Sequence, residues 1–288
     1  MARSWFLGLL LAASVPEVRP TNASPPNILF LFSDDQRFDT IHALGNAEIA
    51  TPHLDRLVRE GFTFSQAHIM GAQQGAVCMP SRAMLLTGRS VFRCTIPPGD
   101  QSIPANLPLW PERLRLAGYE TIGIGKGPND RPAYARSFSR GGPIFFGGMS
   151  SHTAVPVFDF DASGKYPKNQ QHVANEFSSV LFADSAIRVL KEPAQSPFLL
   201  YVAFTAPHDP RTPPANFTNP YAPEKITLPK NFLPEHPFDN GELRVRDERL
   251  LPWPRTPEAV RNEIALYYAM VSHLDAQVGR ILQALEES

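Results

Sequence analysis

The fold is decided by the stretch NILFLFSDD at residues 27–35, where five consecutive apolar residues end abruptly at a serine and two aspartates. An apolar run this short predicts a strand buried on both faces of a sheet, because a buried helix needs a longer one. A second run of this type, FLLYVAF at residues 198–204, ends just before Pro207-His208-Asp209-Pro210. Both runs are typical of the inner strands of a parallel sheet.

Helical patterns separate these strands. The clearest is the last, where apolar residues between Val260 and Leu285 recur in steps of three and four and mark one face of a long helix. Strands that alternate with helices predict an α/β domain with a mixed, largely parallel sheet flanked by helices. Further elements are expected as helices at 52–60, 78–87, 107–117 and 172–190 and as a short strand at 119–124.

The composition excludes several classes of protein. The chain has 288 residues, with 27 lysines and arginines against 28 aspartates and glutamates, so it carries no basic footprint for nucleic acid. Its two cysteines, Cys78 and Cys94, cannot form a disulfide framework, although they could pair with each other. The length allows one large domain, and the 30 prolines predict long irregular surface segments.

The N-terminal segment MARSWFLGLLLAASVPEVRPTNAS has the form of a secretory signal peptide, with Arg3 before an apolar stretch from Trp5 to Ala13. That stretch is too short to span a membrane, and no later stretch is long enough, so no membrane span is expected. Cleavage near Ala23 would leave a domain at residues 24–288. The protein is therefore predicted to be exported, to the periplasm, the medium or a lumen.

Asp34 and Asp35 place two carboxylates at the end of the first strand, at the edge of the sheet where α/β domains bind ligands. Oxygen ligands of this kind suit Ca²⁺, or alternatively Mg²⁺. The competing interpretation is a strand-ending turn, in which aspartate is also common. Gly125-Lys126 and His208 follow the other two strands and are expected at the same edge.

The segment Cys78-Met79-Pro80-Ser81-Arg82, followed by Leu86-Thr87-Gly88-Arg89, resembles the signature of the sulfatase family. The resemblance runs from Asn27 almost to the C-terminus and includes the paired aspartates, TPHLDRLVREGFTFSQAH, the GK pair and His208. It implies an alkaline-phosphatase-like fold and a hydrolase of sulfate monoesters. It also implies that a formylglycine-generating or sulfatase-maturing enzyme oxidises Cys78 to formylglycine, and that the substrate is a sulfated small molecule or glycan.

The resemblance assigns a role to each residue of the motifs. Asp34 and Asp35 would hold Ca²⁺ next to the nucleophile derived from Cys78, which would also contact the ion. Arg82 would support the nucleophile, and Lys126 would contact the sulfate through its charge. His208 would be the general acid at the leaving oxygen.

Two features depart from the family pattern. Where members usually carry a histidine in Lys-Trp-His, this chain has Pro128, so either His152 substitutes or turnover is impaired. The chain also stops at Ser288, before the strand in which the family completes its metal site, so we expect the N-terminal portion of a sulfatase with the C-terminal part missing. Asp239-Asn240-Gly241 does not follow an apolar strand and is interpreted as a surface turn.

Two alternatives stay open. The first is a phosphate or phosphonate ester hydrolase of the same superfamily, which can share the metal carboxylates and the formylglycine. The second, which the two departures motivate, is a non-catalytic protein that binds sulfated ligands. The long connections at 127–170 and 209–256 are predicted to shape the leaving-group pocket. They contain aromatic and basic candidates for that role, namely Phe145, Phe146, His152, Tyr166 and Arg211.

Overall fold

The computed structural model describes residues 24–71, 77–94, 102–128, 130–243 and 245–288, so the predicted signal peptide at 1–23 lies outside the described residues. Its main sheet has four parallel strands in the order β1-β6-β2-β3. They are β1 (Ile28–Asp34), β6 (Phe198–Pro207), β2 (Glu120–Lys126) and β3 (Arg140–Phe145). The sequence-based prediction of an α/β domain with a largely parallel sheet is confirmed.

The two apolar runs differ in their position in the sheet. β6 lies between β1 and β2, and every residue from Leu199 to Pro207 is buried. β1 lies at an edge, and all of its residues before Asp34 are only half-buried. β1 still packs against an apolar core on each face, through Leu29 and Leu31 on one and Phe30 and Phe32 on the other, so the predicted burial on both faces is only partial. An apolar composition does not reveal whether a strand has one neighbour or two.

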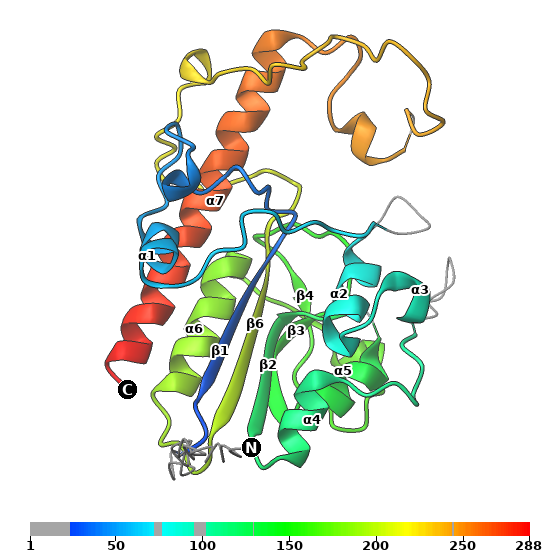
Figure 1. Ribbon diagram of the computed structural model, residues 1–288, viewed down its shortest axis with the longest axis vertical. Coiled ribbons are helices and arrows are strands. Elements are labelled where there is room, and N and C mark those ends of the chain that lie inside the picture. The colour runs from blue at the N-terminus through cyan, green and yellow to red at the C-terminus, as the bar shows by residue number, and fades with distance from the viewer. Residues whose placement is uncertain (1–23, 72–76, 95–101, 129, 244) are drawn as a thin grey trace, which may run out of the picture.

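Helices cover both faces of the sheet (Figure 1). On one face, α6 (Ser178–Leu190) packs against the long α7 (Pro257–Glu286), and α1 (Pro52–Glu60) lies against α7. Towards the other face lie α2 (Cys78–Thr87), α4 (Trp110–Leu116) and α5 (Arg131–Ser137). The remaining helix and strands are short: α3 (Val91–Cys94), and β4 (Pro156–Val157) with β5 (His172–Val173) in a two-stranded antiparallel sheet.

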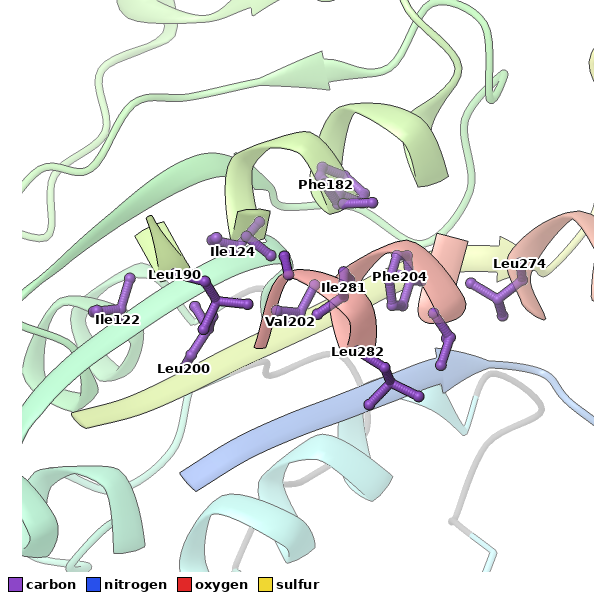
Figure 2. Packing of buried hydrophobic residues seen from close by; sticks show 14 of the residues in the cluster. Ile122, Ile124, Phe182, Leu190, Leu200, Val202, Phe204, Leu274, Ile281 and Leu282 are labelled. Carbon is purple, nitrogen blue, oxygen red and sulfur yellow. The ribbon is translucent and has the colours of Figure 1, made fainter. Parts of the chain in front are cut away.

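The alternation of side chains along β6 separates two apolar cores. Leu200, Val202 and Phe204 point to the face covered by α6 and α7, where they meet residues such as Phe182 and Ile281 (Figure 2). Tyr201 and Ala203 point to the opposite face and pack with the aromatic rings of α5 and of the segment after β3. Because both faces are apolar, β6 fixes the position of its carboxyl end and of the loop that follows it.

Two predictions about elements need correction. The helix expected from His172 begins only at Ser178, because His172 and Val173 form β5 and pair with Pro156 and Val157. β3 and α5 were not predicted at all. β3 reads RGGPIF, and its glycines and proline are residues that strands usually avoid.

No disulfide joins Cys78 and Cys94, both of which the structure describes. Across the described ranges, the structure contains no helix that is both long and apolar enough to cross a membrane.

Candidate active site

The sequence-predicted site residues come together at the carboxyl edge of the sheet, at the ends of β1, β2 and β6. Figure 1 shows where these strands lie. Asp34 is the last residue of β1, Lys126 is the last of β2, and His208 directly follows β6. Cys78 is the first residue of α2, as the sequence predicted, and Arg82 lies one turn further along that helix. Parallel strands bring these residues together because their carboxyl ends share one edge.

Asp34 is the centre of the site. Its carboxylate is only 5 % exposed and forms an ion pair with the ammonium group of Lys126, which is 2 % exposed. The guanidinium of Arg82 lies 3.7 Å from the same carboxylate, and the Sγ atom of Cys78 lies 3.5 Å from its Oδ1. Lys126 also donates a hydrogen bond of 2.7 Å to the carbonyl oxygen of Gly148. A buried carboxylate is tolerated here because cations surround it.

Asp35 has an unusual backbone. Its φ of 60° lies in the left-handed region, which aspartate tolerates better than most residues but which still has an energetic cost. The hydroxyl of Tyr267 donates to its carbonyl oxygen at 2.5 Å, and this contact helps to hold the conformation. The carboxylate lies 3.9 Å from the Sγ atom of Cys78 and 3.3 Å from Nε2 of His208. Burial raises the pKa of Asp35, although the nearby His208 opposes the shift.

Arg82 is buried between the sheet and α2. Its Nη1 donates a hydrogen bond of 2.9 Å to the carbonyl oxygen of Lys126, and its guanidinium lies 4.8 Å from the ring centre of Phe32. Its Nε and Nη2 atoms have no hydrogen-bond partner among the described residues. Nη2 is the atom that lies 3.7 Å from the Asp34 carboxylate, so it faces that anion at a distance too long for a hydrogen bond.

The Cys78 thiol is protonated near neutral pH. Burial, and after it the charge of Asp34, raises its pKa to about 11. Cysteines that act as thiolate nucleophiles have a lowered pKa instead. An unmodified Cys78 is therefore a poor nucleophile in this site.

Cys94 lies in a different environment. It is packed among Ala83, Leu86 and other apolar side chains, and its sulfur lies 3.2 Å from the hydroxyl of Thr87.

His208 is held on both sides of its ring. Its Nε2 faces Asp35, and its Nδ1 lies 2.9 Å from the main-chain oxygen of Asp209 and 3.2 Å from that residue's carboxylate. Arg246 in turn donates two hydrogen bonds, of 2.6 and 3.1 Å, to the Asp209 carboxylate. Burial alone would raise the pKa of Asp209, but the bonds from Arg246 and the charge of His208 outweigh it and lower the pKa.

His152 does not contact the nucleophile, which was the role predicted if it replaced the histidine absent at Pro128. Its ring is buried and lies against the ring of Phe177. Its Nε2 lies 2.9 Å from the main-chain oxygen of His208, and its Nδ1 lies 2.9 Å from the hydroxyl of Ser178. The structure thus connects His152 to the backbone that carries His208.

Only part of the predicted leaving-group pocket is confirmed. A hollow of about 400 Å³ next to Asp35 is lined by Arg211, together with Arg37, Glu263 and Tyr267. Phe145 and Tyr166 are buried in the apolar cores. Further lining residues are Pro229, Asp247, Leu250, Leu251, Arg255, Val260 and Ile264.

The aromatic residues among the candidates thus serve mainly the core, and basic and acidic residues line the hollow. Asp239-Asn240-Gly241 forms an exposed turn, as predicted, in which the Asp239 and Asn240 side chains accept hydrogen bonds from main-chain N–H groups two residues on.

Carboxylate, thiol and imidazole groups at this edge lie close enough together to hold a metal ion. Ligand atoms of Asp34, Cys78 and His208 lie within 4.8 Å of one another, and so do those of Asp35, His208 and Asp209. Two adjacent carboxylates suit Ca²⁺ or Mg²⁺, which prefer oxygen ligands. Burial raises the pKa of Asp35 because it disfavours the charged carboxylate, and a bound cation would offset that cost.

Three contributors to the site were missed from the sequence. Tyr267 belongs to the apolar stripe of α7, so its periodicity indicated a core residue. Asp209 was seen only as a neighbour of His208. Arg246 lies in an irregular segment 37 residues from Asp209, and no spacing pattern connects the two.

Known proteins are similar to this chain in sequence and in fold. A family model described as Sulfatase matches residues 26–288. An ulvan-active sulfatase of Formosa agariphila is 26 % identical over 270 residues, which cover 91 % of this chain and 47 % of the relative. The chain spans about half the length of the curated relatives that it matches.

Two solved structures show the same fold at low sequence identity. The phosphonate monoester hydrolase of Agrobacterium radiobacter has a TM-score of 0.65 at 20 % identity, over 91 % of this chain and 60 % of its own. A protein solved with its substrate D-glucosamine-2-N,6-O-disulfate has a TM-score of 0.63 at 20 % identity, over 91 % of this chain and 62 % of its own. The fold is therefore alkaline-phosphatase-like. With the family model matching nearly all of the described residues, the chain belongs to the sulfatase family.

Proposed function

We propose that the protein hydrolyses sulfate monoesters with a formylglycine made from Cys78, in a site where Asp34 and Asp35 hold Ca²⁺. One observation carries the proposal. Cys78 begins α2 within the family motif and faces both carboxylates, yet its thiol pKa of about 11 makes it a poor nucleophile. Oxidation by a maturing enzyme would turn this inert thiol into a reactive group.

The surrounding residues fit this chemistry. Hydrated formylglycine would supply two geminal hydroxyls, one to attack the sulfur and the other to release sulfate. Lys126 and Arg82, which both pair with Asp34, would offer positive charge and donors to the sulfate oxygens. His208 would protonate the leaving oxygen through Nε2, the ring nitrogen that faces Asp35. Ca²⁺ held by Asp34 and Asp35 would favour the deprotonated nucleophile.

The substrate we propose is a sulfated small molecule or glycan. The hollow next to Asp35 carries Arg37, Arg211 and Glu263, and polar side chains of this kind suit a hydroxyl-rich or charged leaving group. We also propose that the protein is exported, that residues 1–23 are removed as a signal peptide, and that a sulfatase-maturing enzyme acts on Cys78.

The proposal is tested with the full-length protein co-expressed with a sulfatase-maturing enzyme. Trypsin releases residues 60–82 as one peptide, since no lysine or arginine lies between Arg59 and Arg82. Conversion of Cys78 replaces its sulfur and two hydrogens by one oxygen and lowers the mass by about 18 Da. An unmodified peptide from a competent host would contradict the proposal.

The second candidate is a phosphate or phosphonate ester hydrolase, which the fold shared with the Agrobacterium radiobacter enzyme favours. The same preparation distinguishes the two, by its turnover of 4-nitrophenyl sulfate, phosphate and phenylphosphonate. We expect sulfate to be preferred, and a strong preference for a phosphorus ester would reject the first proposal. Binding of sulfated glycans without turnover of any ester would support the non-catalytic alternative that Pro128 motivates.

A further inference from the structure

His152 anchors a buried hydrogen-bond network that ends on the backbone of His208. The imidazole Nε2 lies 2.9 Å from the His208 carbonyl oxygen. The Nδ1 atom lies 2.9 Å from the hydroxyl of Ser178 and 3.2 Å from that of Thr205, and the Thr205 hydroxyl donates to Ser178 at 2.8 Å. All four residues are buried, so water does not compete for these bonds.

The network fixes the tautomer of His152. A carbonyl oxygen only accepts, so Nε2 carries the proton that it donates to His208. Nδ1 is then an acceptor for the Ser178 hydroxyl, which in turn accepts from Thr205. The main-chain N–H of Ser178 also donates to the His152 carbonyl oxygen at 2.7 Å. His152 is thus tied at both its ring and its backbone to the first residue of α6.

The same network holds the turn that presents His208. The N–H of His208 donates to the carbonyl oxygen of Thr205 at 3.2 Å, and the Thr205 side chain bonds to Ser178. Both peptide groups of His208 are therefore anchored, one through Thr205 and the other through His152. Misplacing a catalytic group by about 1 Å can lower a rate on the order of a hundredfold, so this anchoring matters for proton transfer.

We propose that His152 is a positioning residue that holds His208 where Nε2 can protonate the leaving oxygen. This role rests on the proposed function. It differs from the direct contact with the nucleophile, which was one of the two alternatives left open by the sequence, because His152 acts through the His208 backbone.

The test is the dependence of hydrolysis on the leaving group. An ester of 4-nitrophenol needs little protonation of its leaving oxygen, whereas an ester of phenol needs much more. In the full-length, converted enzyme we expect His152→Ala to lower kcat for phenyl sulfate about tenfold more than for 4-nitrophenyl sulfate. His152→Gln, whose amide N–H can donate to the same carbonyl, is expected to recover most of the difference.

A matched control is His273→Gln. His273 is also buried and packs edge-on against Phe177, but the structure shows no hydrogen bond from it to His208. This variant is expected to lower kcat for both esters by the same factor. NMR of labelled histidine side chains gives a readout without turnover: the His208 signals should shift in His152→Ala and stay in place in His273→Gln.

Two failures are distinguishable. An equal loss for both esters in His152→Ala, with unshifted His208 signals, would overturn the positioning role alone. Absence of hydrolysis by the converted wild type would overturn the proposed function, and this role with it.

Discussion

The two ends of the parallel sheet both carry clusters of opposite charges, and they differ in burial. At the amino end, Arg140 pairs with Glu120 at 2.6 Å and with Glu192 at 2.8 Å, and these side chains are 37–52 % exposed. At the carboxyl end, the Asp34, Lys126 and Arg82 side chains are at most 6 % exposed. Exposed pairs add little stability, whereas buried charges are costly and depend on one another.

The size of a hollow does not separate the two ends. The hollow at the amino end, next to Glu120 and Arg140, measures about 560 Å³, against about 400 Å³ for the one next to Asp35. What distinguishes the carboxyl end is the set of desolvated groups that converge there. Burial of reactive groups is therefore the better guide to function in this molecule.

The largest effect is expected from Cys78→Ala, which removes the nucleophile. In the full-length protein, hydrolysis of 4-nitrophenyl sulfate should fall at least about a thousandfold, because the rest of the site cannot attack sulfur. Cys94→Ala is the matched control, since that sulfur lies in an apolar cluster, and it should retain activity. Retention of full activity by Cys78→Ala would contradict the proposed mechanism.

The next largest effect is a loss of stability at the carboxyl end of the sheet. Lys126→Met leaves the buried Asp34 without its closest cation, so we expect the free energy of unfolding to fall by about 3 kcal/mol. Urea denaturation of variant and wild type, both in chelator, would measure the change. A loss below about 1 kcal/mol would show that this pair behaves like a surface pair.

A third prediction concerns His273, a titratable side chain that is buried without an ion-pair partner among the described residues. Burial lowers the pKa of His273 to about 4 from 6.5. The unfolded chain therefore takes up a proton below pH 6.5, whereas the folded chain does so only near pH 4, and acid favours unfolding. Between pH 7 and pH 5, the wild type should lose about 2 kcal/mol more than His273→Gln in urea denaturation. Equal losses would show that folding does not lower the pKa of His273.

The smallest effect is expected at the amino end. Arg140→Gln breaks both exposed ion pairs, and we expect the free energy of unfolding to fall by less than about 1 kcal/mol with hydrolysis unchanged. Urea denaturation at low and high salt provides the measurement. A loss as large as that of Lys126→Met would erase the distinction between the two ends.

The sequence predicted the residues of the site better than the distant residues that hold them in place. Asp34 and Lys126 each end a strand and His208 follows one, and the rule that ligands bind at carboxyl ends was enough to bring them together. Contacts made across long separations left no pattern, so the bond between Tyr267 and the Asp35 backbone was not foreseen.

The fold shows the same division. β6 and α7 were predicted because their apolar patterns are continuous or periodic. β3 was missed because Gly141, Gly142 and Pro143 give it no strand pattern, and it is the neighbouring β2 that makes it a strand. Local chemistry is thus readable from the sequence, while pairing partners are set by the tertiary structure.

The edge position of β1 has a consequence for handling the protein. Among the described residues β1 pairs with β6 alone, so the N–H and C=O groups along its other side are available to a further strand. Two copies of this chain could pair there, edge to edge. We therefore expect the isolated chain to self-associate as its concentration rises, and light scattering across a dilution series belongs beside every measurement of stability.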